Sequence, residues 1–181
     1  MRIALATLNG CDRATFVAAL GPLFEGSPWV AEAGFEGRPF RDAHHLHQGL
    51  CAAMQRAGSE RQLALMRAHP DLAGRFARQG QLTAESSREQ AAAGLVSLAP
   101  EVIAELEALN ATYRQRFGFP FILCARLNNL ETVRSALRSR LESTPEAEHR
   151  NALAEIEKIA WLRLVDVLEP GATDETSEPA S

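Results

Sequence analysis

One histidine of this sequence stands directly before a proline, in the stretch Ala68-His69-Pro70-Asp71. Proline fixes its own backbone and steers the residue before it out of the α-helical region. We therefore expect His69 at the end of the helix-like run that precedes it, in an extended conformation, with its imidazole directed off the helix axis. Such a histidine presents, at a fixed angle, a group that titrates near neutral pH. A simple helix end with a polar side chain is the alternative for this stretch alone.

Ser86, Glu89 and Gln90 have a spacing that brings their side chains together. On a helix, positions i, i+3 and i+4 share one face. A hydroxyl, a carboxylate and an amide on one face can bind a polar heterocycle that presents both hydrogen-bond donors and acceptors. A solvated helix face is the competing interpretation of the same three residues.

Glycine and proline alternate with phenylalanine in the stretch Phe117-Gly118-Phe119-Pro120-Phe121, which Ile122-Leu123-Cys124-Ala125-Arg126 continues. We expect an irregular, buried segment here, in which regular secondary structure does not use every backbone N–H group. N–H groups beside apolar walls suit a small anionic ligand. Arg126 ends the run with a guanidinium that can hold a carboxylate through two hydrogen bonds. A buried connector that ends in a surface arginine is the alternative.

Three histidines, His44, His45 and His47, lie close together and must be weighed as metal ligands. On a helix, His44 and His47 can share a face. A catalytic zinc uses three protein ligands, and the sequence has neither an H-E-x-x-H motif nor an evident carboxylate partner. We therefore expect a partly exposed helix face at these histidines and no metal site.

The elements that carry these residues are predicted to be helices nearly throughout. Apolar residues recur with the helical period, and no run shows the clean alternation and β-branched enrichment of a strand. We expect one helix that starts near Pro28 and others over residues 12–20, 42–57, 59–69, 84–93, 100–117, 128–141 and 145–167. The arginines at positions 134, 138 and 140 are expected on a solvated helix face together with Glu131 and Glu142.

Helix starts are predicted from side chains that can cap free backbone N–H groups. Asp12 and Asp42 are expected as N-caps, and so is Ser27, with Pro28 at the first helical position. Two further starts show the spacing of a capping box, Ser59 with Gln62 and Asn128 with Glu131.

The composition limits the possible function classes. The chain has 181 residues, of which 46% are hydrophobic and 23% charged, and its net charge is −4. This is the balance of a globular domain, and it argues against a binder of nucleic acid or anionic membranes, which needs a basic surface. No stretch is long enough to span a membrane. The cysteines, Cys11, Cys51 and Cys124, are odd in number and far apart, so we expect reduced thiols in the cytoplasm.

These observations predict an all-α fold, with about seven to eight helices in a single compact domain over residues 1–168. Residues 169–181 are acidic, rich in Ser, Thr and Pro, and show no periodicity. We expect them to form a disordered tail.

The motifs together resemble the 2-oxo-4-hydroxy-4-carboxy-5-ureidoimidazoline (OHCU) decarboxylase family, over roughly residues 8–168. The pairing of HPDLAG with FGFPF is the most specific part of the resemblance. The resemblance implies an all-helical, cofactor-free, usually dimeric enzyme that converts the ureidoimidazoline to (S)-allantoin and CO2, the last step of urate breakdown. The matching residues, in order, are Glu25-Gly26-Ser27-Pro28-Trp29, Arg38-Pro39-Phe40, Ala68-His69-Pro70-Asp71-Leu72-Ala73-Gly74, Ser86-x-x-Glu89-Gln90, Ala93-Gly94-Leu95 and Phe117-Gly118-Phe119-Pro120-Phe121.

The resemblance also implies roles for individual residues. His69 matches the essential histidine that acts as proton donor or acid/base, Glu89 its partner carboxylate, and Arg126 the arginine of the site. The residues that match substrate contacts are Pro70, Ser86, Gln90 and a backbone segment formed by Phe121, Ile122, Leu123, Cys124 and Ala125. The implied protein is a cytoplasmic homodimer without metal or cofactor.

Other functions stay open from the sequence. A helical binding module without catalysis would account for the fold equally well, but not for a histidine fixed by proline or for the FGFPF segment. A related enzyme that processes another ureide is a second possibility. A metal hydrolase that uses His44, His45 and His47 is a third.

Overall fold

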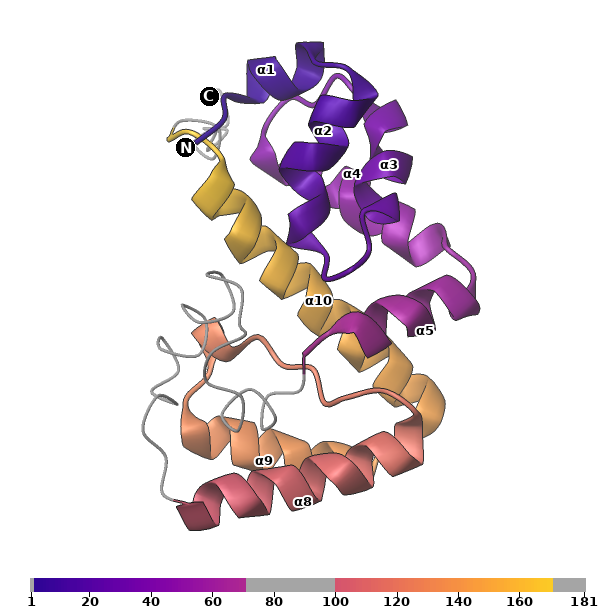
Figure 1. The fold of residues 1–181 in the computed structure, drawn as a ribbon, viewed down its shortest axis with the longest axis vertical. Coiled ribbons are helices and arrows are strands. Elements are labelled where there is room, and N and C mark those ends of the chain that lie inside the picture. The colour runs from indigo at the N-terminus through magenta and orange to yellow at the C-terminus, as the bar shows by residue number, and fades with distance from the viewer. Residues whose placement is uncertain (1, 71–99, 171–181) are drawn as a thin grey trace, which may run out of the picture. The chain divides into compact units, whose positions relative to one another are not determined.

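The computed structural model describes residues 2–70 and 100–170 (Figure 1). Within these ranges the chain forms eight α-helices and three short 3-10 helices, and its one β contact is an isolated parallel bridge between Ile3 and Leu168. This confirms the all-α prediction. The chain divides into two compact units, Met1–Ser59 with Ile159–Ser181, and Glu60–Lys158. The predicted helix at 84–93 and most of the predicted tail, residues 171–181, lie outside the described residues.

The first unit is built from short helices and the end of a long one. They are α1 (Leu5–Gly10), α2 (Arg13–Leu20), α3 (Trp29–Gly34), α4 (Ala43–Arg56), the 3-10 helices η1 (Gly21–Leu23) and η2 (Phe35–Gly37), and the last part of α10 (Pro145–Val167). Both predicted aspartate caps are confirmed. Asp12 accepts a hydrogen bond from the N–H of Thr15 at 2.8 Å and Asp42 from that of His45 at 2.7 Å. These bonds hold the pKa of both carboxyl groups below the usual range.

The predicted cap of α3 is wrong by one residue. The N-cap position of α3 is Pro28, with φ −60° and ψ −17°, and no side chain caps the helix. Ser27 is buried, and its carbonyl accepts a hydrogen bond from the N–H of Val30 at 3.1 Å. A tight turn that begins at Ser27 therefore leads into the helix, because Pro28 is already in a helical conformation.

A close contact between α3 and α4 fixes the centre of the first unit. A Cβ atom at Gly34 would lie 2.6 Å from Cδ2 of Leu50, so a larger residue there would force the Leu50 side chain to move. Leu46, Leu50 and Phe16 are fully buried in this core. The same unit buries a charge, Arg163 of α10, whose guanidinium donates to Glu25 and to the carbonyl of Leu23, both at 3.2 Å.

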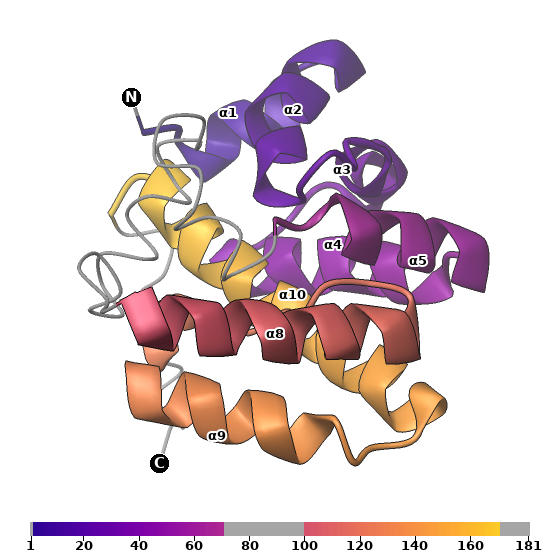
Figure 2. The ribbon, with the colours of Figure 1, turned by 60° about the horizontal axis from the view of Figure 1, so that its bottom comes forward.

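The second unit is formed by longer helices. It contains α5 (Ser59–Ala68), α8 (Pro100–Phe117), η3 (Ala125–Leu127), α9 (Leu130–Arg140) and the first part of α10. Helices α8 and α9 lie side by side (Figure 2). The core of the second unit contains Tyr113, Phe121 and Val133, each at most 1% exposed.

The cap of α9 also differs from the prediction by one residue. Asn129, not Asn128, caps the helix, and it forms a capping box with Thr132 in place of Glu131. The structure gives the reason, because the side-chain N–H of Asn128 donates to the carbonyl of Cys124 at 2.9 Å. Asn128 thus holds the preceding segment, and its neighbour caps the helix.

A polar contact in the second unit joins α5 to α10. Nε2 of His149 and Oε1 of the buried Gln62 are 2.8 Å apart. Because the amide oxygen only accepts, Nε2 of His149 carries the proton of this bond. Partial burial lowers the pKa of His149 below its usual value, since desolvation penalises the charged ring.

Candidate active site

His69 lies directly after the last residue of α5, as predicted from the proline that follows it. Its backbone N–H donates to the carbonyl of Met66 at 3.2 Å, and its ring is buried, with only 6% of the residue exposed. Nδ1 lies 3.2 Å from the carbonyl oxygen of Leu65, so the ring is held against the last turn of the helix. A carbonyl can only accept, so the neutral ring carries its proton on Nδ1 and its lone pair on Nε2.

The end of α5 is bound to the start of the FGFPF segment. Nε of Arg67 donates to the carbonyl of Gly118 at 2.9 Å. Gly118 ends α8 with φ +80°, a left-handed conformation that favours glycine. This bond joins the end of α5, two residues before His69, to the start of the segment, which is far away in the sequence.

The segment from Phe121 to Ala125 is irregular and buried, as predicted. Residues 121–124 belong to no helix or strand, and none of the five residues is more than 9% exposed. The first ring of the segment packs in an aromatic cluster, because Phe121 meets Tyr113 edge to face at 5.4 Å between ring centres. Such packing holds an irregular backbone in place without a hydrogen-bonded ladder.

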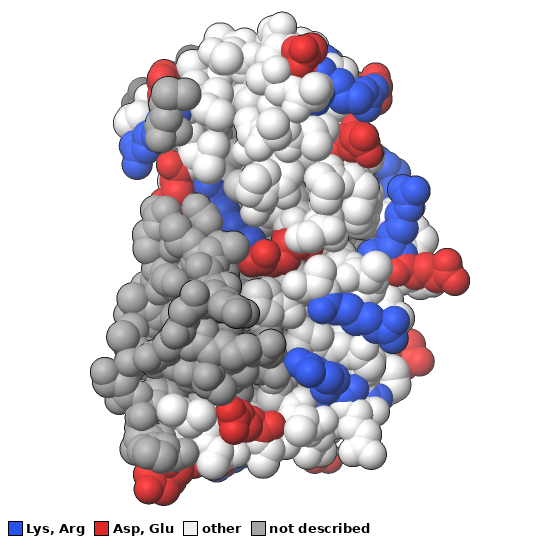
Figure 3. Space-filling view, viewed as in Figure 1, with Lys and Arg blue, Asp and Glu red and all other residues white. Residues whose placement is uncertain are grey.

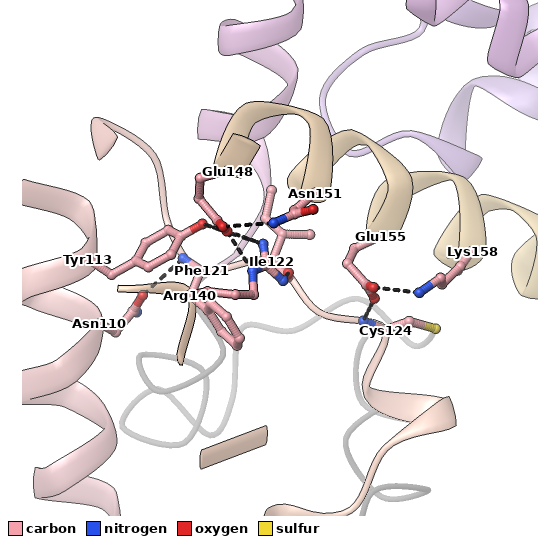
Figure 4. A network of polar contacts seen from close by, with 10 residues as sticks. All are labelled: Asn110, Tyr113, Phe121, Ile122, Cys124, Arg140, Glu148, Asn151, Glu155 and Lys158. Carbon is pink, nitrogen blue, oxygen red and sulfur yellow. Dashed lines mark hydrogen bonds and ion pairs between the residues drawn. The ribbon is translucent and has the colours of Figure 1, made fainter. Parts of the chain in front are cut away.

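Three side chains, two buried and one largely buried, hold the backbone of this segment (Figure 4). The N–H of Phe121 donates to Oδ1 of Asn110 at 3.0 Å, and the N–H of Cys124 donates to Oε2 of Glu155 at 2.8 Å. Between them, the carbonyl of Ile122 accepts from the guanidinium of Arg140 at 2.8 Å. Helices α8, α9 and α10 therefore each contribute one residue that fixes a peptide group of the segment.

Arg140 is itself fixed by a buried carboxylate. Its guanidinium pairs with Glu148, whose side chain is fully buried, and the hydroxyl of Tyr113 donates to the same carboxylate oxygen. Asn151 donates to the other oxygen at 3.2 Å. Burial, and the hydrogen bond to Glu148, raise the pKa of Tyr113 far above its usual value.

The prediction of a solvated face at the three arginines is wrong for Arg140. Arg138 is 56% exposed and fits the prediction, whereas the side chain of Arg140 is 13% exposed. Arg140 follows the buried Val133 and Leu137 at helical spacing, so it lies on the apolar face of α9. Arg134 is intermediate, and pairs with Glu105 at 2.6 Å.

The remaining predicted site residues fall into two groups. Arg126 lies on η3, directly after the buried segment, and is half-buried, as is Pro70 next to His69. Ser86, Glu89 and Gln90 lie outside the described residues, so their place in the site stays a prediction. The second unit thus contains His69, Pro70 and residues 121–126 of the predicted site.

The three clustered histidines pack against aromatic rings. His44 and His47 both contact Trp161, with ring centres 4.4 and 5.3 Å apart, and His45 meets Phe40 edge to face. In the described ranges, no group of three or more metal-ligating side chains is arranged to hold an ion. These histidines therefore belong to the packing of the first unit.

Three residues that shape the site were not predicted from the sequence, namely Asn110, Arg140 and Glu155. Each lies at helical spacing from buried apolar neighbours, which is a signal that the sequence contains. Asn110 lies between Leu106 and Tyr113 on α8, and Glu155 between Ala152 and Ile159 on α10. A polar residue at a core position is uncommon unless it is hydrogen-bonded.

Comparison with known proteins identifies the family of this chain. A sequence model described as OHCU decarboxylase matches residues 9–165. A Mus musculus protein named 2-oxo-4-hydroxy-4-carboxy-5-ureidoimidazoline decarboxylase is 46% identical over 167 residues, 91% of this chain and 92% of that protein. A protein of the same name from Amia calva is 41% identical over 92% of this chain and 95% of its own length.

A solved structure shows the same fold. A crystal structure of (S)-allantoin synthase matches with a TM-score of 0.74 and 29% sequence identity, over 92% of this chain and 54% of that chain. The family model spans most of the sequence, and the two relatives are similar along nearly their whole length. The chain belongs to the OHCU decarboxylase family.

Proposed function

We propose that this protein decarboxylates 2-oxo-4-hydroxy-4-carboxy-5-ureidoimidazoline to (S)-allantoin and CO2 in urate catabolism, without a metal or cofactor. The observation that carries the proposal is the buried His69 at the end of α5, joined through Arg67 and Gly118 to an irregular backbone segment. Family membership supplies the substrate class, since relatives are named for this reaction.

The chemistry of the substrate explains why a cofactor is unnecessary. Its carboxylate sits on a ring carbon that is bonded to the electron-withdrawing imine carbon and to the ring nitrogen that adjoins the carbonyl. When the bond to the carboxylate breaks and CO2 leaves, the electron pair is delocalised onto ring heteroatoms. The enzyme then has to stabilise this charge and deliver one proton to one face of the ring.

The proposed roles follow from the residues. His69 contacts the hydroxyl-bearing, carboxylated carbon and manages the proton, while Glu89 hydrogen-bonds the ureido or ring N–H groups. Arg126 stabilises charge on the substrate, together with N–H groups of the segment formed by Phe121, Ile122, Leu123, Cys124 and Ala125. The N–H groups of Phe121 and Cys124 are excluded from this role, because Asn110 and Glu155 already accept from them. Pro70, Ser86 and Gln90 complete the contacts. Protonation from one face yields a single enantiomer.

A coupled assay tests the reaction and its main residue together. Urate is converted in place by urate oxidase and hydroxyisourate hydrolase, the protein is added, and the circular dichroism of allantoin is followed. We expect rapid growth of a single-handed signal, which His69→Asn lowers by about 10²–10⁴-fold because it removes a positioned acid/base. Near-normal turnover in a His69→Asn variant with intact helicity would refute the assignment.

The same assay separates the competing functions. Slow, racemic product at the spontaneous rate would favour the binding module or an enzyme for another ureide.

A thermal-shift measurement provides a second discrimination. Allantoin should stabilise the protein in proportion to occupancy, whereas a module that recognises proteins should ignore it. Loss of activity in chelator would instead favour the metal hydrolase.

Small-molecule binding agrees with the surface of the protein. On the face shown in Figure 3, acidic and basic side chains are interspersed among the described residues, unlike the basic field that nucleic acid requires. Within residues 2–70 and 100–170, no helix combines the length and apolar character needed to cross a membrane.

We also propose that the enzyme acts as a homodimer in the cytoplasm. All three cysteines are free thiols, as expected in a reducing compartment. Leu127, which is 59% exposed beside Arg126, is an apolar residue that a second copy could cover. Light scattering that gives the mass of one chain would contradict the dimer.

A further inference from the structure

The two peptide groups that flank Leu123 are held by hydrogen bonds to side chains from outside the segment. Arg140 holds the carbonyl of Ile122, and Glu155 holds the N–H of Cys124. Glu155 is a residue of α10, and Arg140 is bound to Glu148 on the same helix. The N–H of Cys124 therefore points to Glu155 on α10, and the carbonyl of Ile122 points to Arg140 (Figure 4).

The orientation of the Leu123 peptide groups follows from peptide geometry. The two peptide bonds are trans, and in a trans peptide the carbonyl and the N–H point in opposite directions. The N–H of Leu123 shares a peptide with the held carbonyl of Ile122, and its carbonyl shares one with the held N–H of Cys124. Leu123 thus presents one donor and one acceptor, directed away from Arg140 and Glu155 respectively.

Neither backbone group of Leu123 is used by the fold among the described residues. No backbone or side-chain partner is found there for its N–H or its carbonyl, although the residue is only 9% exposed. Buried backbone groups are nearly always paired, so this pair is available to a ligand. A donor beside an acceptor is complementary to a ring edge where N–H and C=O are adjacent, as in a cyclic ureide.

We propose that Glu155 and Arg140 are positioning residues, which orient the N–H and carbonyl of Leu123 to bind the amide edge of a cyclic ureide. This inference rests on the proposed function, because the substrate and product of that reaction carry such an edge. Glu155 acts through Cys124 and Arg140 through Ile122, so neither needs to touch the ligand. Substrate and product both carry this amide edge. Loss of the contacts with Leu123 should therefore weaken the binding of both.

The test compares three variants at the α10 end of this arrangement. Glu155→Ala removes the acceptor for Cys124, whereas Glu155→Gln keeps an oxygen there. Lys158→Met is the matched control, because Lys158 pairs with the other oxygen of Glu155 at 2.6 Å and is half-exposed. For each protein we would measure KM and kcat in the coupled assay, Kd for (S)-allantoin, and amide hydrogen exchange by NMR.

We expect Glu155→Ala to accelerate exchange of the Cys124 amide and to raise KM and Kd together by about 10–100-fold, with a smaller effect on kcat. Glu155→Gln and Lys158→Met should stay within about threefold of the wild type. A purely structural role would lower kcat with the folded fraction and leave KM and Kd unchanged. That result, with a rapidly exchanging Cys124 amide, would overturn the proposal.

A titration of the wild type provides a test that does not depend on any variant folding. Added (S)-allantoin should shift the amide resonance of Leu123 and slow its exchange, while the Cys124 amide is protected with or without ligand. An unchanged Leu123 amide at saturation would overturn the proposal.

The same data separate this inference from the proposed function. A wild type that forms no (S)-allantoin above the spontaneous rate refutes the decarboxylase. The positioning of Leu123 is then judged by binding of allantoin and of hydantoin, the parent cyclic ureide. A shifted Leu123 amide supports it, and the absence of binding by both compounds overturns it as well.

Discussion

Replacement of Arg140 by methionine should strongly destabilise the second unit. Methionine has a similar shape but no charge, so Arg140→Met leaves the carboxylate of Glu148 fully buried without its cation. Breaking a buried pair from one side typically costs about 3–5 kcal/mol of unfolding free energy. The carbonyl of Ile122 also loses its donor, which adds about 1 kcal/mol. We expect a loss of at least about 3 kcal/mol in total.

Replacement of the partner residue, Glu148→Gln, should lower the unfolding free energy much less than Arg140→Met. In Glu148→Gln the amide oxygen can still accept from Tyr113, and Arg140 retains contact with the ring of Phe121 at 4.7 Å. The double variant, Arg140→Met with Glu148→Gln, leaves no unpaired charge. It should therefore be more stable than Arg140→Met alone, with a coupling free energy of about 1–3 kcal/mol.

Urea unfolding of the four proteins measures these differences. Circular dichroism reports all helices, whereas both tryptophans, Trp29 and Trp161, belong to the first unit. A fluorescence transition that shifts less than the dichroism transition would show that the damage is confined to the second unit. A loss below about 1 kcal/mol in Arg140→Met, or a double variant no better than the single one, would refute the reasoning.

Three further predictions concern single residues. Tyr113 is the only tyrosine of the chain, and its pKa is raised in the folded protein. The native protein should therefore show no tyrosinate absorbance near pH 10, where the tyrosine of the unfolded chain titrates. The unfolding free energy should accordingly fall as the pH rises above about 10. The lowered pKa of His149 favours its neutral form in the folded state, so stability should fall as the pH drops through about 6.5, and His149→Gln should flatten this dependence in urea unfolding at a series of pH values. Gly118→Ala places a side chain at φ +80° and should cost about 1–2 kcal/mol of unfolding free energy, measured in the same way; an unchanged midpoint would contradict it.

Local signals in the sequence predicted most of the described helices. The bounds of α4 and α8 agree with the expectation to within a residue or two, because aspartate caps and Gly or Pro at helix ends act within one turn. His69 is at a helix end for the same local reason. The cap of α9 could not be assigned locally, since Asn128 and Asn129 are equally good caps and a contact with Cys124 decides between them.

Contacts between distant residues set the limit of prediction at the site. The FGFPF stretch predicted an irregular, buried segment, and the structure confirms that. Which side chains hold its backbone could not be predicted, because Arg140 and Glu155 are 18 and 31 positions away from Ile122 and Cys124. Hydrophobic periodicity shows that a residue faces a core, but it does not show which neighbour it meets there.

The two arginines at the end of α9 show what can still be learned from the pattern. Arg138 and Arg140 are two residues apart, yet one side chain is 56% exposed and the other 13%. Only Arg140 shares the helix face of Val133 and Leu137. A charged residue at a core position of a helix needs a buried partner of opposite charge. The partner of Arg140 is Glu148 on α10, whose side chain is fully buried. Charges on apolar helix faces are therefore the first residues to test, since here they hold the backbone on which substrate binding is proposed to depend.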